Sequence, residues 1–179
     1  MKRVSLILLH LFLFFTGSAR ALADDAAVPE YAMKAAYLYN FAQLTDWPIQ
    51  GGVSDDGFNL CVFGQEELIA ALESLRGRLI NGHQLRVVRI ADVADARHCH
   101  LMYVSDSDST RGIRLLESLR GAPVLTVSDD QRAVRYGAML MIVPEQHRLT
   151  FEINLDAARR SQMKFSSKLL RLAKKVNGE

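Results

Sequence analysis

Three consecutive residues, His98, Cys99 and His100, carry side chains that bind zinc and other transition metals. On an extended segment, however, the two histidines point one way and the cysteine the other. A closed zinc site needs four ligands, so the two histidines would require help from His83 or His147. The simpler interpretation is a pair of surface histidines beside a buried sulfur. We therefore expect no metal site and no cofactor.

One tetrapeptide resembles a nucleophile motif. Ser161–Lys164 reads S-x-x-K, as in penicillin-recognising serine enzymes, and Ser105–Ser107 differs by one residue from their S-D-N motif. The third motif, K-T-G, is absent, and the S-x-x-K lies near the C-terminus, in the wrong order along the chain. Sequence spacing does not exclude a Ser–His–acid arrangement, but no feature favours one. We predict that the protein is not an enzyme.

Two further sequence features do not require a functional site. Leu60–Gly64, followed by a helical pattern, resembles the start of a nucleotide-binding βαβ unit, but the remaining glycines of that fingerprint are missing. A binding site for a small ligand at the carboxyl ends of the strands is an open alternative, which rests on the fold class alone. The acidic pairs Asp55-Asp56 and Asp129-Asp130 fall in loops, where a solvated turn is the usual explanation.

The first 23 residues have the layout of a bacterial secretory signal. A basic start, Met1–Arg3, precedes a 12-residue apolar run, Val4–Phe15, and Ala19–Ala23 offers two overlapping A-x-A cleavage sites. The run is shorter than the about 20 residues that span a bilayer, although an uncleaved membrane anchor is the alternative. Cleavage after Ala23 would leave residues 24–179 as a single domain in the periplasm.

Removal of that segment changes the charge of the chain. Without Lys2, Arg3 and Arg20, 19 basic residues remain against 20 acidic ones, a net charge of −1. This balance shows no sign of a nucleic-acid partner, which would require a concentrated basic face. No second apolar stretch of about 18 residues follows, so we expect a protein that is not embedded in the membrane.

The chain has two cysteines, Cys61 and Cys99. In an oxidising compartment an isolated pair is typical of one disulfide, which here would close a loop of about 39 residues. Two unpaired buried thiols are the alternative.

Apolar periodicity and turn residues predict alternating strands and helices. The predicted helical segments are Pro29–Trp47, Glu66–Leu75, a short turn at Asp92–Arg97, Asp108–Leu119, and Asp156–Val176 with a break near Ser161–Ser166. The predicted strands are Phe58–Phe63, Gln84–Ile90, His100–Val104, Val124–Val127, Ala138–Val143 and Leu149–Ile153. We expect Ser166 to cap a final helix over Ser167–Lys175, with Lys174 and Lys175 at its C-terminal dipole.

This alternation indicates an α/β fold. We predict a mostly parallel sheet covered by helices on both faces, extended by a C-terminal antiparallel hairpin, with helices near both ends of the chain.

Aromatic residues are crowded onto the first predicted helix and its end: Tyr31, Tyr37, Tyr39, Phe41 and Trp47. Such residues are usually core, but more aromatics than one face can hide indicate contact with a partner. Tyr31, Tyr39 and Trp47, together with Phe165, are therefore our candidates for a partner or dimer surface.

Two segments resemble a known family. Lys34–Ala42, followed by Asp46-Trp47-Pro48, is similar to the opening helix of the YfiR-like periplasmic family. Phe151–Ala158, followed by Phe165–Ala173, resembles its closing strand and helices, and Leu60–Gly64 lies between them where the family places a strand.

The resemblance implies a periplasmic repressor of an inner-membrane diguanylate cyclase, which holds the sensor domain of the cyclase inactive and so lowers cyclic-di-GMP and biofilm formation. It also implies sequestration by an outer-membrane peptidoglycan-associated lipoprotein, a homodimer, and a structural disulfide at Cys61 and Cys99. Some relatives carry a second cysteine pair, which this chain lacks. A periplasmic small-ligand binding or sensor module without a cyclase partner is the alternative, and an unrecognised hydrolase is a third hypothesis.

Overall fold

The computed structural model of the protein describes residues 29–48, 57–105, 109–145 and 148–178. The predicted signal segment and the Asp55-Asp56 pair lie outside the described residues. Within them, no helix is long and apolar enough to cross a bilayer.

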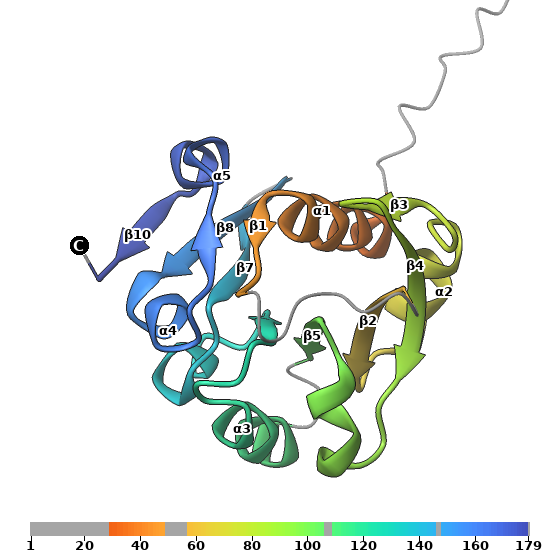
Figure 1. The fold of residues 1–179 in the computed structure, drawn as a ribbon, viewed down its shortest axis with the longest axis horizontal. Coiled ribbons are helices and arrows are strands. Elements are labelled where there is room, and N and C mark those ends of the chain that lie inside the picture. The colour runs from red at the N-terminus through yellow and green to blue at the C-terminus, as the bar shows by residue number, and fades with distance from the viewer. Residues whose placement is uncertain (1–28, 49–56, 106–108, 146–147, 179) are drawn as a thin grey trace, which may run out of the picture.

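One eight-stranded sheet organises the fold (Figure 1). Its strands, in spatial order, are β10 (Lys175–Asn177), β8 (Arg148–Asn154), β7 (Leu140–Glu145), β6 (Leu125–Ser128), β5 (Leu101–Val104), β2 (Phe58–Phe63), β4 (His83–Arg89) and β3 (Leu79–Ile80). The run from β7 through β6, β5 and β2 to β4 is parallel. The β7/β8 and β3/β4 pairs are antiparallel, and β10 joins β8 in parallel.

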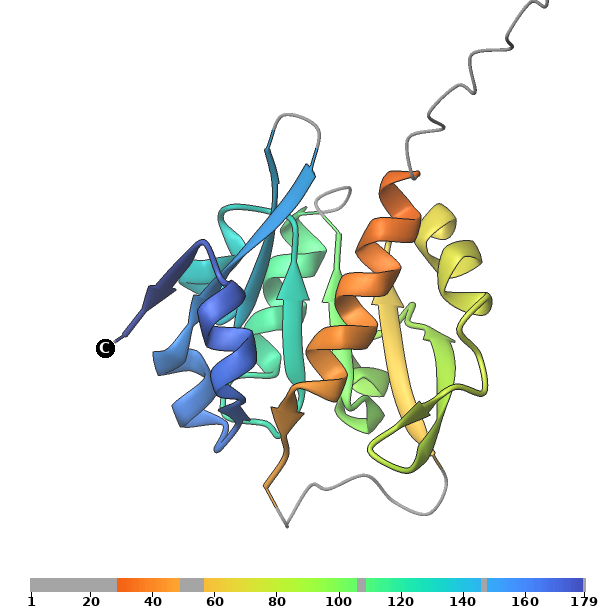
Figure 2. The same cartoon turned by 90° about the horizontal axis from the view of Figure 1, so that it is seen from above.

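Helices cover both faces of this sheet (Figures 1 and 2). One face is covered by α1 (Glu30–Gln43), α2 (Glu66–Glu73), α4 (Leu155–Arg160) and α5 (Ser167–Leu172). The other is covered by α3 (Ser109–Ser118) and two 3-10 turns, η1 (Val93–His98) and η3 (Ala133–Tyr136). Because side chains alternate along a strand, Leu60 and Val62 of β2 face α1 and α2, whereas Cys61 and Phe63 face the layer of α3. The predicted α/β class and the C-terminal hairpin are confirmed.

The first helix is shorter than predicted. It ends at Gln43, and Thr45–Asp46 forms strand β1, which pairs antiparallel with strand β9 (Lys164–Phe165). The Thr45 hydroxyl donates to the Phe41 carbonyl at 2.7 Å, and the Ser166 N–H donates to the Leu44 carbonyl. Strand β9, more than 100 residues later in the chain, therefore supplies the backbone hydrogen bonds at Thr45–Asp46. Helical periodicity alone predicted that the helix would continue to Trp47.

The last helix is also shorter than predicted. Ser166 caps α5 as expected, because its hydroxyl accepts the Leu169 N–H, but the helix ends at Leu172. The backbone becomes extended at Ala173, and the Lys174 N–H donates to the Phe151 carbonyl of β8. Lys174 and Lys175 therefore lie next to β8 and not at a helix C-terminus. Pairing with β8 gives their backbone hydrogen bonds that the end of a helix would leave unmade.

Cys61 and Cys99 form a disulfide, with their Cα atoms 5.9 Å apart. Both sulfurs are buried under the layer of α3 and η1. The bridge joins β2 to the residue that follows η1, just before β5, the strand next to β2 in the sheet.

We predict that the Cys61→Ala/Cys99→Ala variant loses about 4 kcal/mol of unfolding free energy, because the open chain regains loop entropy. Urea unfolding of the oxidised wild type and of this variant measures the difference. A variant as stable as the wild type would contradict a structural role for the bridge.

Candidate functional site

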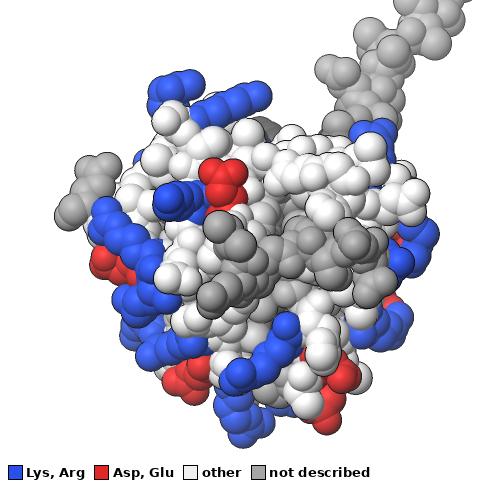
Figure 3. Space-filling model, in the orientation of Figure 1, with Lys and Arg blue, Asp and Glu red and all other residues white. Residues whose placement is uncertain are grey.

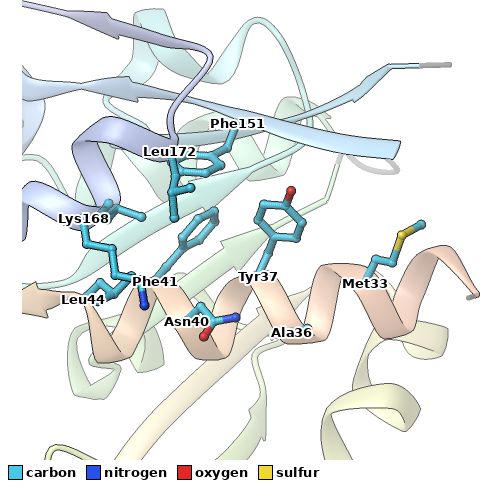
Figure 4. A pocket seen from close by; sticks show the side chains of 10 residues that line it. Met33, Ala36, Tyr37, Asn40, Phe41, Leu44, Phe151, Lys168 and Leu172 are labelled. Carbon is cyan, nitrogen blue, oxygen red and sulfur yellow. The ribbon is translucent and has the colours of Figure 1, made fainter. Parts of the chain in front are cut away.

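A mostly apolar groove lies between α1 and α5 (Figure 4). Its volume is about 410 Å³. The side chains that line it come from α1, β8 and α5: Met33, Ala36, Tyr37, Asn40, Phe41, Leu44, Phe151, Lys168, Leu169 and Leu172. We call this feature the α1/α5 groove.

Three aromatic rings form its floor. Phe41 and Phe151 lie edge to face with centroids 4.9 Å apart, and Tyr37 meets both of them in the same way. The Tyr37 hydroxyl donates a hydrogen bond of 2.6 Å to the Leu149 carbonyl of β8. Because the rings support one another and the hydroxyl is anchored, the floor is preformed and presents apolar surface without an unsatisfied polar group.

Leu172 stands at the mouth of the groove with 62% of its surface exposed. Figure 4 shows its side chain above Phe41, on the side of the groove opposite Tyr37, whereas Lys168 extends from α5 towards Asn40 of α1. A large aliphatic side chain left in water next to an apolar groove marks a surface that can gain free energy by contact with another molecule. The sequence did not single out Leu172, although three leucines in the four positions 169–172 are more than one helix face can bury.

The predicted aromatic surface is not one surface. Tyr39 and Tyr37 point to opposite halves of the sheet: the Tyr39 hydroxyl donates to the Leu79 carbonyl of β3, whereas Tyr37 reaches β8. Tyr31 lies in the first turn of α1, with the Lys34 ammonium 5.7 Å from its ring centroid. All of these rings are half-buried against the main core.

Trp47 and Phe165 lie beyond the C-terminal end of α1. Trp47 packs edge to face on Phe58 at 5.3 Å, and its indole N–H donates to the His100 carbonyl at 3.3 Å. Phe165 stands opposite Thr45 in the β1/β9 pair. Both are half-buried and packed on the core, so their role in a partner or dimer surface stays a prediction.

The His98-Cys99-His100 segment separates its side chains. Cys99 is buried in the disulfide, His98 is exposed at the end of η1, and His100 is half-buried. The Asn59 N–H donates to His100 Nδ1 at 2.8 Å, and the ring lies 5.1 Å from that of Phe58. The described residues contain no group of three or more metal-ligating side chains.

A polar cluster occupies the carboxyl ends of the central strands, where a doubly wound sheet would hold a ligand. Lys34 of α1 is only 4% exposed, and its ammonium lies 2.8 Å from Asp129 after β6 and 2.7 Å from Glu30. The Tyr103 hydroxyl of β5 donates to Gln65 at 3.2 Å, and burial raises the pKa of that hydroxyl well above its usual range. These groups form ion pairs and hydrogen bonds with one another, and the pair between Lys34 and Asp129 joins α1 to the sheet.

The solvated turn predicted for Asp129-Asp130 is therefore wrong. The Asp129 side chain is largely buried against Lys34, which lies 95 residues earlier in the chain. Asp130 is buried as well and accepts from the Arg132 side chain at 2.9 Å. Local sequence shows an acidic loop, but it does not show the lysine that another element brings to it.

The sequence profile of the YfiR/HmsC-like family matches residues 31–174, which include both walls of the groove and both cysteines. The chain belongs to the YfiR/HmsC-like family. This family comprises regulatory, non-catalytic periplasmic proteins of cyclic-di-GMP signalling.

Two solved structures resemble this YfiR/HmsC-like chain. One is an ABC domain in complex with L-Trp from Streptococcus pneumoniae, with a TM-score of 0.52 and 10% identity over 79% of this chain and 60% of that chain. The other is a conserved domain protein from Vibrio cholerae, with a TM-score of 0.49 and 13% identity over 68% and 55% of the two chains. The chain thus spans somewhat more than half of each of these proteins, and the first likeness concerns the fold alone.

Replacement of Lys34 by Met should destabilise the protein by about 3 kcal/mol, because Asp129 would stay buried without its cation. Burial alone would lower the pKa of Lys34, but its hydrogen bonds to Asp129 and Glu30 outweigh this and hold the pKa above 10.5. Since the folded pKa is raised, the stabilisation is complete below pH 10.5 and is lost as the pH rises through the folded value. Urea unfolding at increasing pH should show this loss in the wild type but not in Lys34→Met.

Acid should weaken the packing around His100. Burial, and then the nearby charge of His83, lower the pKa of His100 below 6.5, and its Nδ1 must stay unprotonated to accept the Asn59 N–H. Because the folded pKa is depressed, this stability is present above pH 6.5 and is lost as the pH falls towards the folded value. The His100→Asn variant, whose side-chain oxygen can accept the same hydrogen bond, should show a flatter pH profile of thermal unfolding. Identical profiles would contradict this assignment.

Proposed function

We propose that the protein represses an inner-membrane diguanylate cyclase from the periplasm by binding the sensor domain of the cyclase in the α1/α5 groove. Membership of the YfiR/HmsC-like family over residues 31–174 is the observation that carries this proposal. The groove supports it, because a preformed aromatic floor beside the exposed Leu172 is suited to receive an apolar side chain of another protein.

The proposed mechanism is a shift of the cyclase between two states. A repressor that binds the inactive state more tightly than the active one moves the population towards the inactive state. About 5.5 kcal/mol of preference changes a 1:99 ratio into 99:1. One buried apolar anchor with its surrounding contacts supplies a free energy of this order. The polar groups of the groove walls, Asn40 and Lys168, would then only orient the bound sensor domain.

Three further parts of the proposal come from the family resemblance. The chain reaches the periplasm through a cleaved signal at residues 1–23, it forms a homodimer, and an outer-membrane peptidoglycan-associated lipoprotein sequesters it from the cyclase. These parts are separable from the groove, because export, oligomeric state and antagonist binding are each measured without the cyclase.

A small-ligand sensor is the second candidate function. A volume of about 410 Å³ lies within the range of small-molecule pockets. This reading places an apolar ligand on the aromatic floor and requires no protein partner. A ligand that raises the melting temperature of the protein, with no cyclase recovered on pull-down, would favour it over the repressor.

Complementation of a deletion strain tests the groove. Deletion should raise cyclic-di-GMP and surface attachment, and the wild-type gene should restore both. The Leu172→Glu variant should fail to restore them, because a carboxylate at the mouth of the groove would have to be desolvated on binding, a cost of about 2 kcal/mol or more.

Leu79→Glu provides the matched control, since Leu79 on β3 is 55% exposed and lies outside the groove. Both variants should keep the wild-type melting temperature, because neither side chain belongs to the core. Equal activity of the two variants in cells would refute the groove as the binding site, and unchanged cyclic-di-GMP in the deletion strain would refute the repressor role itself.

A further inference from the structure

The C-terminal part of the chain carries an uninterrupted run of positive charge. Between Ala157 and Gly178 there are seven basic residues and no acidic one. They are Arg159, Arg160, Lys164, Lys168, Arg171, Lys174 and Lys175, and all seven are exposed. The predicted mature chain as a whole is close to neutral, so this charge is concentrated locally and balanced by acids elsewhere.

The run divides into paired and unpaired cations. Arg159 lies 3.5 Å from Asp156, and Lys174 lies 2.7 Å from Glu145. Lys175 stands beside Glu152 in the β10/β8 register. The remaining four have no acidic partner among the described residues: Arg160, Lys164, Lys168 and Arg171.

These cations gather at one end of the sheet. They come from β10 at the edge of the sheet and from α4, β9 and α5, which lie near the β8 side of the sheet and away from α2, β4 and β3 (Figures 1 and 2). Figure 3 shows Lys and Arg side chains, with a few Asp and Glu side chains among them, along the side of the molecule over α4 and β10. The exposed Leu172 belongs to the same end, one residue after Arg171. We call this surface, defined by Arg160, Lys164, Lys168, Arg171 and Leu172, the basic end.

We propose that the basic end binds the anionic headgroups of a phospholipid bilayer. Unpaired cations near a membrane surface are attracted by the lipid phosphates, and an exposed leucine among them can enter the headgroup layer. The association is peripheral and salt-dependent, because it rests on charge and on a single apolar side chain. It is independent of the proposed repressor role, since lipid alone is the ligand.

The distribution of the cations favours lipid over an acidic peptide. Only Lys168 lines the α1/α5 groove, whereas Arg160, Lys164 and Arg171 stand on three successive elements outside it. An acidic peptide is recognised by cations that converge on a cleft, with bidentate contacts to its carboxylates. A bilayer presents many phosphates over a wide area and therefore matches a dispersed set of charges.

Co-sedimentation of the purified protein with vesicles tests this inference. Vesicles of phosphatidylcholine alone are compared with vesicles of equal parts phosphatidylcholine and phosphatidylglycerol, at about 0.1 M and about 1 M salt, where the Debye length falls from about 10 to about 3 Å. We expect binding only to the anionic vesicles and only at the lower salt concentration. The Arg160→Glu/Lys164→Glu/Arg171→Glu variant should bind at least about a hundredfold more weakly, at about fivefold per cation.

The matched control carries the same charge change elsewhere. Arg78, Arg97 and Arg114 are exposed and have no ion pair among the described residues, and they lie outside the basic end. Their triple replacement by Glu should weaken binding much less, and the melting temperatures of both variants should match that of the wild type.

Equal weakening by the two triple variants would overturn the proposal, because net charge alone would then explain the binding. Equal binding to both kinds of vesicle, or no binding to anionic vesicles at low salt, would overturn it as well. Absence of vesicle binding together with loss of cellular repression in the Arg160/Lys164/Arg171 variant would assign the basic end to an acidic protein partner instead.

Discussion

The ion pair between Lys34 and Asp129 sets the position of α1 across the sheet. The ammonium is nearly buried, and it connects the N-terminal half of the helix to the end of β6 near the middle of the sheet. A buried charge with partners on two sides permits little sliding or rotation of the helix that carries it, because any shift would leave a carboxylate unpaired in a poorly solvated place. Tyr37 and Tyr39 then reach opposite halves of the sheet, each with its hydroxyl anchored on a strand carbonyl.

The second wall of the groove depends on pairings between distant parts of the chain. Helix α5 has six residues, too few for a helix that is stable by itself, and it is held between two short strands. β9 pairs with β1 next to the end of α1, and β10 pairs with β8. Leu169 supplies the buried contact that ties the helix to the main core. The groove therefore exists only where the first and the last helices of the described chain meet.

The fold class could be predicted from the sequence because alternation and turn residues are local signals. Leu60 and Val62 show the buried strand, the cysteines indicate the bridge, and Ser166 marks a helix start. The ends of α1 and α5 could not be predicted, because at Thr45 and Lys174 a backbone partner more than 20 residues away replaces the next helical hydrogen bond.

The site was predicted only in part, for a related reason. The crowded aromatics drew attention to α1, which forms one wall of the groove, but the predicted partner surface at Tyr31, Tyr39, Trp47 and Phe165 stays a prediction. Which rings face outward depends on the rotation of the helix, and that rotation is set by Lys34 and Asp129, 95 residues apart. Tyr39 consequently reaches β3, whereas Tyr37 forms the groove floor with Phe151.

The two proposed contact surfaces share α5, and this has a thermodynamic consequence. Leu172 and Lys168 line the groove and also belong to the basic end, which Arg171 of the same helix and Lys164 of β9 extend. A ligand that orders α5 at one of these surfaces lowers the conformational-entropy cost of binding for a ligand at the other surface. Lipid headgroups and a protein in the groove would then favour each other's binding, and by linkage the effect must be equal in both directions. Because each surface also uses Leu172, direct competition for that side chain opposes this coupling, and its sign depends on whether Leu172 turns towards the groove or towards the bilayer.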